Sequence, residues 1–92
     1  MMRLYLVKAE IKDGEEKSLL SLIEGNSAGF FLEFSLRDAK VNDGVVSFSS
    51  VSFTDFEEER KTLEKYFSIM DVSEIRGHYR LNGCPLLDYL RK

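Results

Sequence analysis

The sequence predicts an α+β fold of the ferredoxin-like βαββαβ type: an antiparallel sheet with two helices on one face, followed by a short C-terminal helical turn. Three observations lead to this prediction. Residues 4–12 alternate between apolar and polar side chains, two further alternating stretches flank a turn signal at Asp43-Gly44, and residues 54–70 have helical spacing. This plan hosts many unrelated functions, so the fold alone predicts none.

The composition is that of an ordinary globular protein, with 92 residues, 43% of them hydrophobic and 32% charged. A chain of this size buries roughly two-thirds of its unfolded surface, which is enough for a modest core. Glycine and proline are sparse, and the sequence shows no internal repeat. We therefore expect a single domain spanning residues 1–92.

The charge and the cysteine content exclude several classes of protein. A net charge of −3 and a pI near 5.1 argue against a general binder of nucleic acids or anionic membranes. The single cysteine, Cys84, excludes an intramolecular disulfide framework. No apolar run has the ~20 residues that span a bilayer, and the N-terminal apolar stretch is too short for a signal peptide. A cytoplasmic protein without membrane contact is the expectation.

The first two elements are predicted to be a strand and a helix. In residues 4–12, one face carries Tyr5, Val7 and Ala9 and the other begins with Leu4 and Leu6, so the strand is expected in the interior of the sheet. Residues 13–25 favour a helix, because leucine, glutamate and lysine dominate and Gly25 is a suitable stop. The alternative interpretation makes Asp13-Gly14 a hairpin turn and residues 17–23 a strand.

A long hairpin is predicted around Asp43-Gly44, because both residues tolerate the positive φ that a two-residue turn requires. Residues 30–37 alternate in the pattern of a strand buried on one face. The register brings apolar residues together in every pair but the first: Asn42 with Val45, Val41 with Val46, Ala39 with Phe48, Leu36 with Val51, and Phe34 with Phe53.

The apolar pattern of this hairpin changes phase on both strands, near Arg37-Asp38 and Ser49-Ser50. A bulge would shift one strand only, so the matched change predicts that the tip shows its apolar side on the opposite face of the sheet. Two interpretations follow. The hairpin is strongly twisted and packs within one core, or its tip is built to meet another molecule.

The last third of the chain is predicted to form a helix, a strand and a helical turn. Residues 54–57 form a capping box in which the Thr54 hydroxyl and the Glu57 carboxylate satisfy backbone N–H groups at the start of a helix over 54–70. Residues 75–81 alternate as a strand with one apolar and one basic face. Pro85 suits the first position of a short helix. The basic face consists of Arg76, His78 and Arg80.

Catalytic chemistry is not indicated by the sequence. Cys84 with His78 is the candidate nucleophile and base, but no feature lowers the thiol pKa or supplies an oxyanion site. One histidine and one cysteine do not make a metal site with the expected ligand spacing, and no phosphate-binding glycine-rich loop is present. We expect no catalytic residues, no cofactor and no metal, and hence a protein that is not an enzyme.

The leading hypothesis is a small protein-binding or self-associating module, such as an inhibitor, an immunity-type protein or a regulatory subunit. It would bind a protein partner or form a homodimer through the open face of the sheet and the hairpin tip, because large exposed apolar patches usually mark interfaces. The alternative is a nucleic-acid-associated protein that uses Arg76, His78 and Arg80, although the aromatic residues that normally stack bases are missing from the expected strands. The predicted interface consists of Phe31, Ala39, Val41, Val46 and Phe48.

Overall fold

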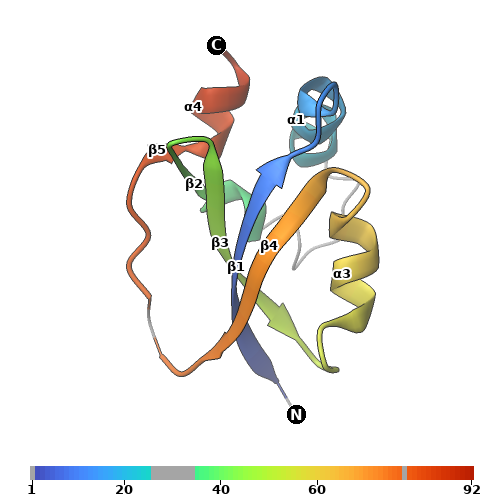
Figure 1. Cartoon of the computed structure of the whole chain (residues 1–92), viewed down its shortest axis with the longest axis vertical. Helices are drawn as coiled ribbons and strands as arrows, with labels where there is room; N and C mark the ends of the chain where they lie inside the picture. The colour runs from blue at the N-terminus through green and yellow to red at the C-terminus, as the bar shows by residue number, and fades with distance from the viewer. Residues whose placement is uncertain (1, 26–34, 78) are drawn as a thin grey trace.

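The computed structural model describes residues 2–25, 35–77 and 79–92. Within them lies a five-stranded antiparallel sheet in the order β4-β1-β3-β2-β5 (Figure 1). The α+β prediction is therefore confirmed. The strands are β1 (Arg3–Ile11), β2 (Lys40–Asn42), β3 (Val45–Ser52), β4 (Phe67–Ile75) and β5 (Cys84–Pro85), and the helices are α1 (Glu16–Glu24), α3 (Glu57–Leu63) and α4 (Leu86–Leu90).

Strand β1 lies in the interior of the sheet, as its two apolar faces predicted. It pairs with β3 on one side and with β4 on the other, and Val7 stands opposite both Phe48 and Val72. Tyr5, Val7 and Ala9 are buried on the face that packs against the helices. Leu4 and Leu6 belong to the opposite face, because successive side chains of a strand alternate.

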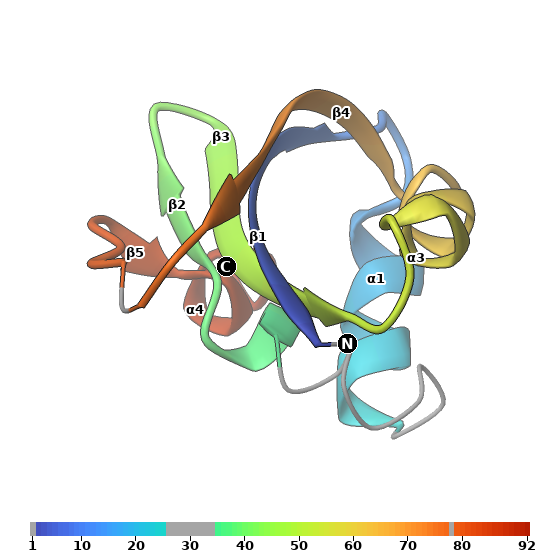
Figure 2. The ribbon, with the colours of Figure 1, turned by 90° about the horizontal axis from the view of Figure 1, so that it is seen from below.

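The sheet is covered differently on its two faces. Helices α1 and α3 lie on one side of β1 and β3, whereas the connection between β4 and β5 runs along the other side (Figures 1 and 2). This connection has to cross the sheet because β4 and β5 form its two opposite edges. We call the described residues between Ile75 and Cys84 the crossover: residues 76, 77 and 79–83. The side of the sheet that faces the helices is the helix face, and the other side is the outer face.

The helical interpretation of residues 13–25 is confirmed, and the strand alternative is wrong. Helix α1 buries Leu19 and Ile23 completely, four residues apart on one stripe. Gly25 follows its last residue, and the Gly25 N–H donates to the Ser21 carbonyl. Helix α1 is joined to the C-terminal segment by an ion pair of 2.8 Å between Glu24 Oε2 and Arg91 Nη2.

The predicted turn at Asp43-Gly44 is confirmed, but the predicted long hairpin is not. Both turn residues have positive φ, 52° and 78°, and Val41 pairs with Val46 as expected. Strand β2 is only three residues long, because residues 35–37 are helical and the Ala39 N–H donates to the Leu36 carbonyl. The expected strand over 35–37 and the Leu36–Val51 pair are therefore wrong, while Phe34 lies outside the described residues.

The predicted change of phase along the hairpin is also wrong. Strand β3 alternates without a break, and Val46, Phe48, Ser50 and Ser52 are all buried on the helix face. The prediction failed because two serines, a residue type that is usually exposed, occupy core positions. Ser50 stands directly opposite Tyr5, whose ring lies 5.3 Å from that of Phe56. A small residue at position 50 leaves room for these two rings, since large and small side chains alternate in close-packed cores.

The predicted helix over 54–70 is much shorter in the structure. Helix α3 begins after Phe56, whose φ is +75°, and ends at Leu63, after which the chain enters β4. No side chain caps α3 in the way the capping box predicted. The hydroxyl oxygen of buried Ser52 accepts the backbone N–H groups of Thr54, at 3.1 Å, and Phe56, at 3.3 Å, and so fixes the approach to the helix.

The strand that was expected at residues 75–81 lies earlier, at Phe67–Ile75. A register shift in the pairing of β1 with β4 explains why it was missed. Ala9 pairs with Ile69 and Lys8 with Asp71, so Met70 is an extra residue that forms a bulge. The bulge breaks the period-2 pattern of Phe67, Ile69 and Val72, which then resembles helical spacing.

Two phenylalanines on β3 or just after it provide a direct test of this arrangement. Phe48 is completely buried and its ring lies 5.8 Å from that of Phe67, whereas Phe53 is 57% exposed. We expect Phe48→Ala to lower the free energy of unfolding by about 3–5 kcal/mol and Phe53→Ala by less than about 1 kcal/mol. Urea unfolding of both variants measures the difference. Equal losses would contradict the assignment of faces.

Candidate functional site on the outer face of the sheet

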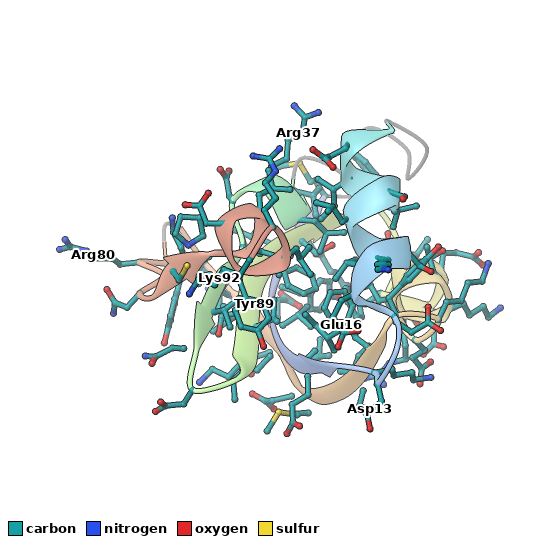
Figure 3. The ribbon with its side chains drawn as sticks, turned by 90° about the horizontal axis from the view of Figure 1, so that it is seen from above. Asp13, Glu16, Arg37, Arg80, Tyr89 and Lys92 are labelled. Atoms are coloured by element: carbon teal, nitrogen blue, oxygen red, sulfur yellow. The ribbon has the colours of Figure 1, made fainter. Side chains whose placement is uncertain are left out.

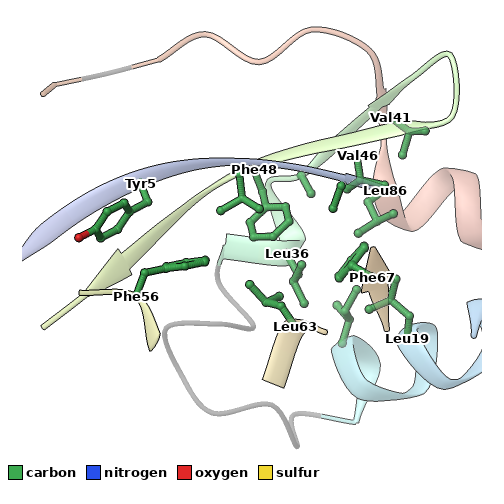
Figure 4. Close-up of a cluster of buried hydrophobic side chains, with 14 residues drawn as sticks. Tyr5, Leu19, Leu36, Val41, Val46, Phe48, Phe56, Leu63, Phe67 and Leu86 are labelled. Carbon is green, nitrogen blue, oxygen red and sulfur yellow. The ribbon is translucent and has the colours of Figure 1, made fainter. Parts of the chain in front are cut away.

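Four of the five residues that were predicted to form an interface are part of the core: Ala39, Val41, Val46 and Phe48. Their side chains lie on the helix face together with Leu19, Phe67 and Leu86 (Figure 4). The predicted placement on the open face is therefore wrong, and the cause is the mistaken change of phase in β3. Phe31 lies outside the described residues. Ala39, Val46 and Phe48 have no exposed surface and Val41 is 6% exposed.

An apolar patch does occupy the outer face, but at the opposite end of β1 and β3 from the hairpin tip. Leu4 stands opposite Val51 on one side and Ile75 on the other, so three half-buried apolar residues form a row across three strands. Met2 and Phe53 lie just beyond the ends of β1 and β3, each two residues from a member of this row in the sequence, and are 65% and 57% exposed. We call Met2, Leu4, Val51, Phe53 and Ile75 the outer apolar patch.

The other half of the outer face is polar. Lys8 stands opposite Asp71 on β4 and Ser47 on β3, and Ser47 stands opposite Lys40 on β2. The Asp71 carboxylate accepts a hydrogen bond of 3.2 Å from the Ser73 hydroxyl two residues along the same face. This row alternates acidic, basic and neutral side chains, which is typical of a solvated sheet surface.

The crossover is anchored to the sheet at its C-terminal end. Strand β5 pairs with β2, with Cys84 opposite Val41, and the Leu86 N–H donates to the Ala39 carbonyl at 2.9 Å. Gly83 has φ +128°, and a Cβ at this position would lie 2.4 Å from the Val41 carbonyl oxygen. Only glycine fits a backbone approach this close.

A groove of about 310 Å³ lies between the crossover and the outer face. Leu6 lines it and is only 6% exposed, although it belongs to the outer face. The groove combines two cationic side chains, Lys8 and Arg80, with the 55% exposed ring of Tyr79. The remaining lining residues are Asn42, Val45, Ser47, Leu81 and Asn82.

The predicted row of basic residues does not lie on a strand. Strand β4 ends at Ile75, so Arg76 and Arg80 belong to the crossover, and His78 lies outside the described residues. Both arginines are exposed, and Arg80 extends away from the rest of the molecule (Figure 3). The two side chains are therefore placed by an irregular segment and not by the pleat of a sheet.

A second groove, of about 370 Å³, lies where α1 and α4 meet residues 35–37. Its charged side chains are Glu24, Arg37 and Arg91, and its apolar ones are Ile23 and Leu87. Glu24 and Arg91 are bound to each other across this groove. Two of its three charges are thus already used in holding α4 against α1.

The described part of the chain assembles no group of metal ligands. Cys84 is half-buried, and its thiol donates to the Pro85 carbonyl at 3.5 Å. Across residues 2–25, 35–77 and 79–92, no three His, Cys, Asp or Glu side chains lie close enough together to hold a metal ion. The described helices are all too short or too polar to pass through a bilayer.

Comparisons with known proteins found no match. No protein-family model matches the chain, and no curated protein or solved structure matches it either.

Sequence reasoning missed most of the outer apolar patch. Leu4 was placed on this face correctly, but Val51 and Phe53 were assigned to the core because Ser50 and Ser52 look like surface residues. The correct phase follows from period-2 spacing that starts at Val46 and Phe48. Continued along β3, this spacing places Ser50 and Ser52 on the same face as those two residues, and Val51 and Phe53 on the other. Ile75 was assigned to a strand over 75–81, so its position beside Leu4 was not foreseen.

The anchoring of the crossover is tested by two glycines within it, one near each end. We expect Gly83→Ala to detach β5, because the new Cβ would strike the Val41 carbonyl. Gly77 also has positive φ, +87°, but a Cβ there meets nothing within 4 Å. Gly83→Ala should raise the rate at which a thiol reagent modifies Cys84 by roughly tenfold or more, and Gly77→Ala should change it little. Equal rates in both variants would contradict this anchoring.

Proposed function

We propose that the protein is a small, non-enzymatic protein-binding module that uses the outer apolar patch. The observation that carries this proposal is the exposure of Met2 and Phe53 beside the apolar row of Leu4, Val51 and Ile75. Isolated exposed apolar residues are common, but a contiguous group on one sheet face usually marks an interface. The patch thus takes the place of the hairpin tip in the original hypothesis.

The outer apolar patch would form the central part of a modest interface. Burying apolar surface is worth about 25 cal/mol per Å² before the cost of association, so a few side chains contribute binding energy but do not suffice alone. The rest would come from the rim, where Arg3 and Arg76 flank the patch in the sequence. An inhibitor, an immunity-type protein or a regulatory subunit would use such a surface, and a homodimer is the self-associating form of the same proposal.

A second candidate function is binding of a single-stranded nucleic acid in the groove beneath the crossover. Within the groove, Tyr79 offers an exposed ring for base stacking and Lys8 offers a charge for a phosphate, while Arg80 extends outward beside it. The net charge of −3 weighs against this candidate, because nucleic-acid affinity depends mainly on neutralising phosphates. The protein-binding proposal therefore ranks first.

The proposal also includes the fold type and the cellular location of the protein. Elements β1, α1, β2, β3, α3 and β4 follow in the order of the ferredoxin-like plan, and β5 with α4 adds an edge strand and a turn. This order supports a variant of that plan with an elongated connection before β2. A cytoplasmic location remains the expectation, supported by the single free cysteine.

The proposal predicts the effect of making the outer apolar patch polar. Met2→Ser with Phe53→Ser should leave the free energy of unfolding within about 1 kcal/mol of the parent, because both side chains are mostly exposed. It should weaken partner binding or self-association at least roughly tenfold, because the centre of the interface is lost. The matched control is Lys17→Ser with Lys61→Ser, which changes two exposed helix residues.

Affinity capture from the host, quantified for the parent, the double variant and the control, measures partner binding, and light scattering measures self-association. A protein retained by the parent and the control but lost with the patch variant supports the proposal. Binding of a labelled oligonucleotide that the patch variant retains and Arg76→Gln with Arg80→Gln loses would contradict it and favour the second candidate.

A further inference from the structure

We propose that the edge of β4 receives an extended, basic segment of a partner protein as an additional strand of the sheet. This inference deepens the proposed function and rests on it, because it names the chemistry of the partner. Among the residues that the structure describes, β4 pairs with β1 alone and forms one edge of the sheet. Its other side carries backbone groups that a further strand can bind.

The usable part of this edge is residues 71–75. They pair with β1 in unbroken register, from Asp71 opposite Lys8 to Ile75 opposite Leu4. In an antiparallel ladder, alternate residues direct both N–H and C=O away from the neighbour. One of two sets therefore presents its backbone groups to an incoming strand: Val72 and Glu74, or Asp71, Ser73 and Ile75.

The bulge at Met70 limits the site at one end. Bulges twist an edge strand and interrupt pairing, so an added strand cannot continue past this point without its own irregularity. Met70 itself is 55% exposed, and an exposed methionine beside an open edge offers an adaptable apolar contact. The incoming segment is thus about five residues long.

The charge of the edge determines the kind of partner. Strand β4 contains Asp71 and Glu74 and no basic residue, and both carboxylates are exposed. A second copy pairing through the same edge would bring two more carboxylates on its β4, while the nearby cations, Lys8 and Arg3, belong to the next strand, β1. Since cross-strand charges of opposite sign stabilise a sheet and like charges destabilise it, the edge favours a basic segment over a second copy.

The register also predicts the pattern of that segment. Asp71 and Ile75 lie on the outer face and Val72 and Glu74 on the helix face, so the carboxylates are three residues apart on opposite faces. An antiparallel partner then needs apolar residues beside Ile75 and Val72 and cations beside Glu74 and Asp71. The sequence Val-Lys-Thr-Val-Lys satisfies this pattern. Ile75 is shared with the outer apolar patch, so an added strand would extend that patch.

The opposite edge of the sheet does not offer such a site. Strand β5 has two residues, and one of them is Pro85, which has no backbone N–H. Of the two edge strands, β4 is therefore the longer one and offers more backbone N–H donors.

The test uses the full chain and a fluorescein-labelled peptide in which Val-Lys-Thr-Val-Lys is flanked by glycine and serine. We expect binding by fluorescence anisotropy, with amide NMR shifts concentrated in residues 71–75. The peptide Val-Glu-Thr-Val-Glu should not bind. Methylating alternate backbone nitrogens of the lysine peptide removes the donors on one of its edges, so one of the two alternately methylated peptides should lose binding and the other should keep it.

Charge variants of the protein complete the test. Asp71→Asn with Glu74→Gln should weaken the lysine peptide roughly five- to tenfold, since exposed ion pairs contribute modestly. The matched control, Glu57→Gln with Glu58→Gln on α3, should leave its affinity unchanged. Thermal unfolding of both variants verifies that they fold.

Three results would overturn the inference: no shifts in residues 71–75 at millimolar peptide, equal binding of the lysine and glutamate peptides, or a dimer in which the edge of β4 is occupied by a second copy. Loss of peptide binding alone leaves the proposed function standing if partner capture still depends on Met2 and Phe53. If partner capture does not depend on Met2 and Phe53 while the peptide binds β4, the proposed role of the outer apolar patch is contradicted and binding at the edge of β4 is supported.

Discussion

The pairing of β1 with both β3 and β4 is the constraint on which the rest of the structure depends. Because β1 is central, its two faces have different surroundings, and Tyr5, Val7 and Ala9 define the side on which a core can form. Helices α1, α3 and α4 supply the apolar residues that complete this core. The alternation of β3 then has to follow β1, which places Phe48 inside and Val51 outside.

The same constraint accounts for the outer face. The apolar residues of β1 that point away from the helices need another cover, and the crossover supplies it only in part. Leu6 is almost fully covered near the groove, whereas Leu4 is half-buried and its neighbours Met2 and Phe53 are mostly exposed. This incompletely covered sheet face, next to an open, acidic edge strand, is the surface on which the protein-binding proposal rests.

Much of the fold was accessible from the sequence, but the site was not. Strand β1, helix α1, the Asp43-Gly44 turn and the C-terminal helical turn follow from periodicity and turn chemistry, which act locally. The boundaries of β2 and β4 depend on tertiary pairing. The bulge at Met70 and the buried Ser50 and Ser52 each override the local pattern, and both serines are tolerated only because of what packs around them. A wrong phase in β3 then exchanged core and surface in the predicted interface.

The central claim is that one face of β1 and β3 packs against the helices and the other carries the crossover and the outer apolar patch. Nuclear Overhauser contacts in a protein with labelled rings and methyl groups test it most directly. The structure predicts contacts of the Phe48 ring with the Phe67 ring within one chain, and it places the Leu6 methyls on the opposite face of the sheet, in the groove beside the crossover. Contacts of Phe48 with Leu6 or with a second chain, and none with Phe67, would contradict it.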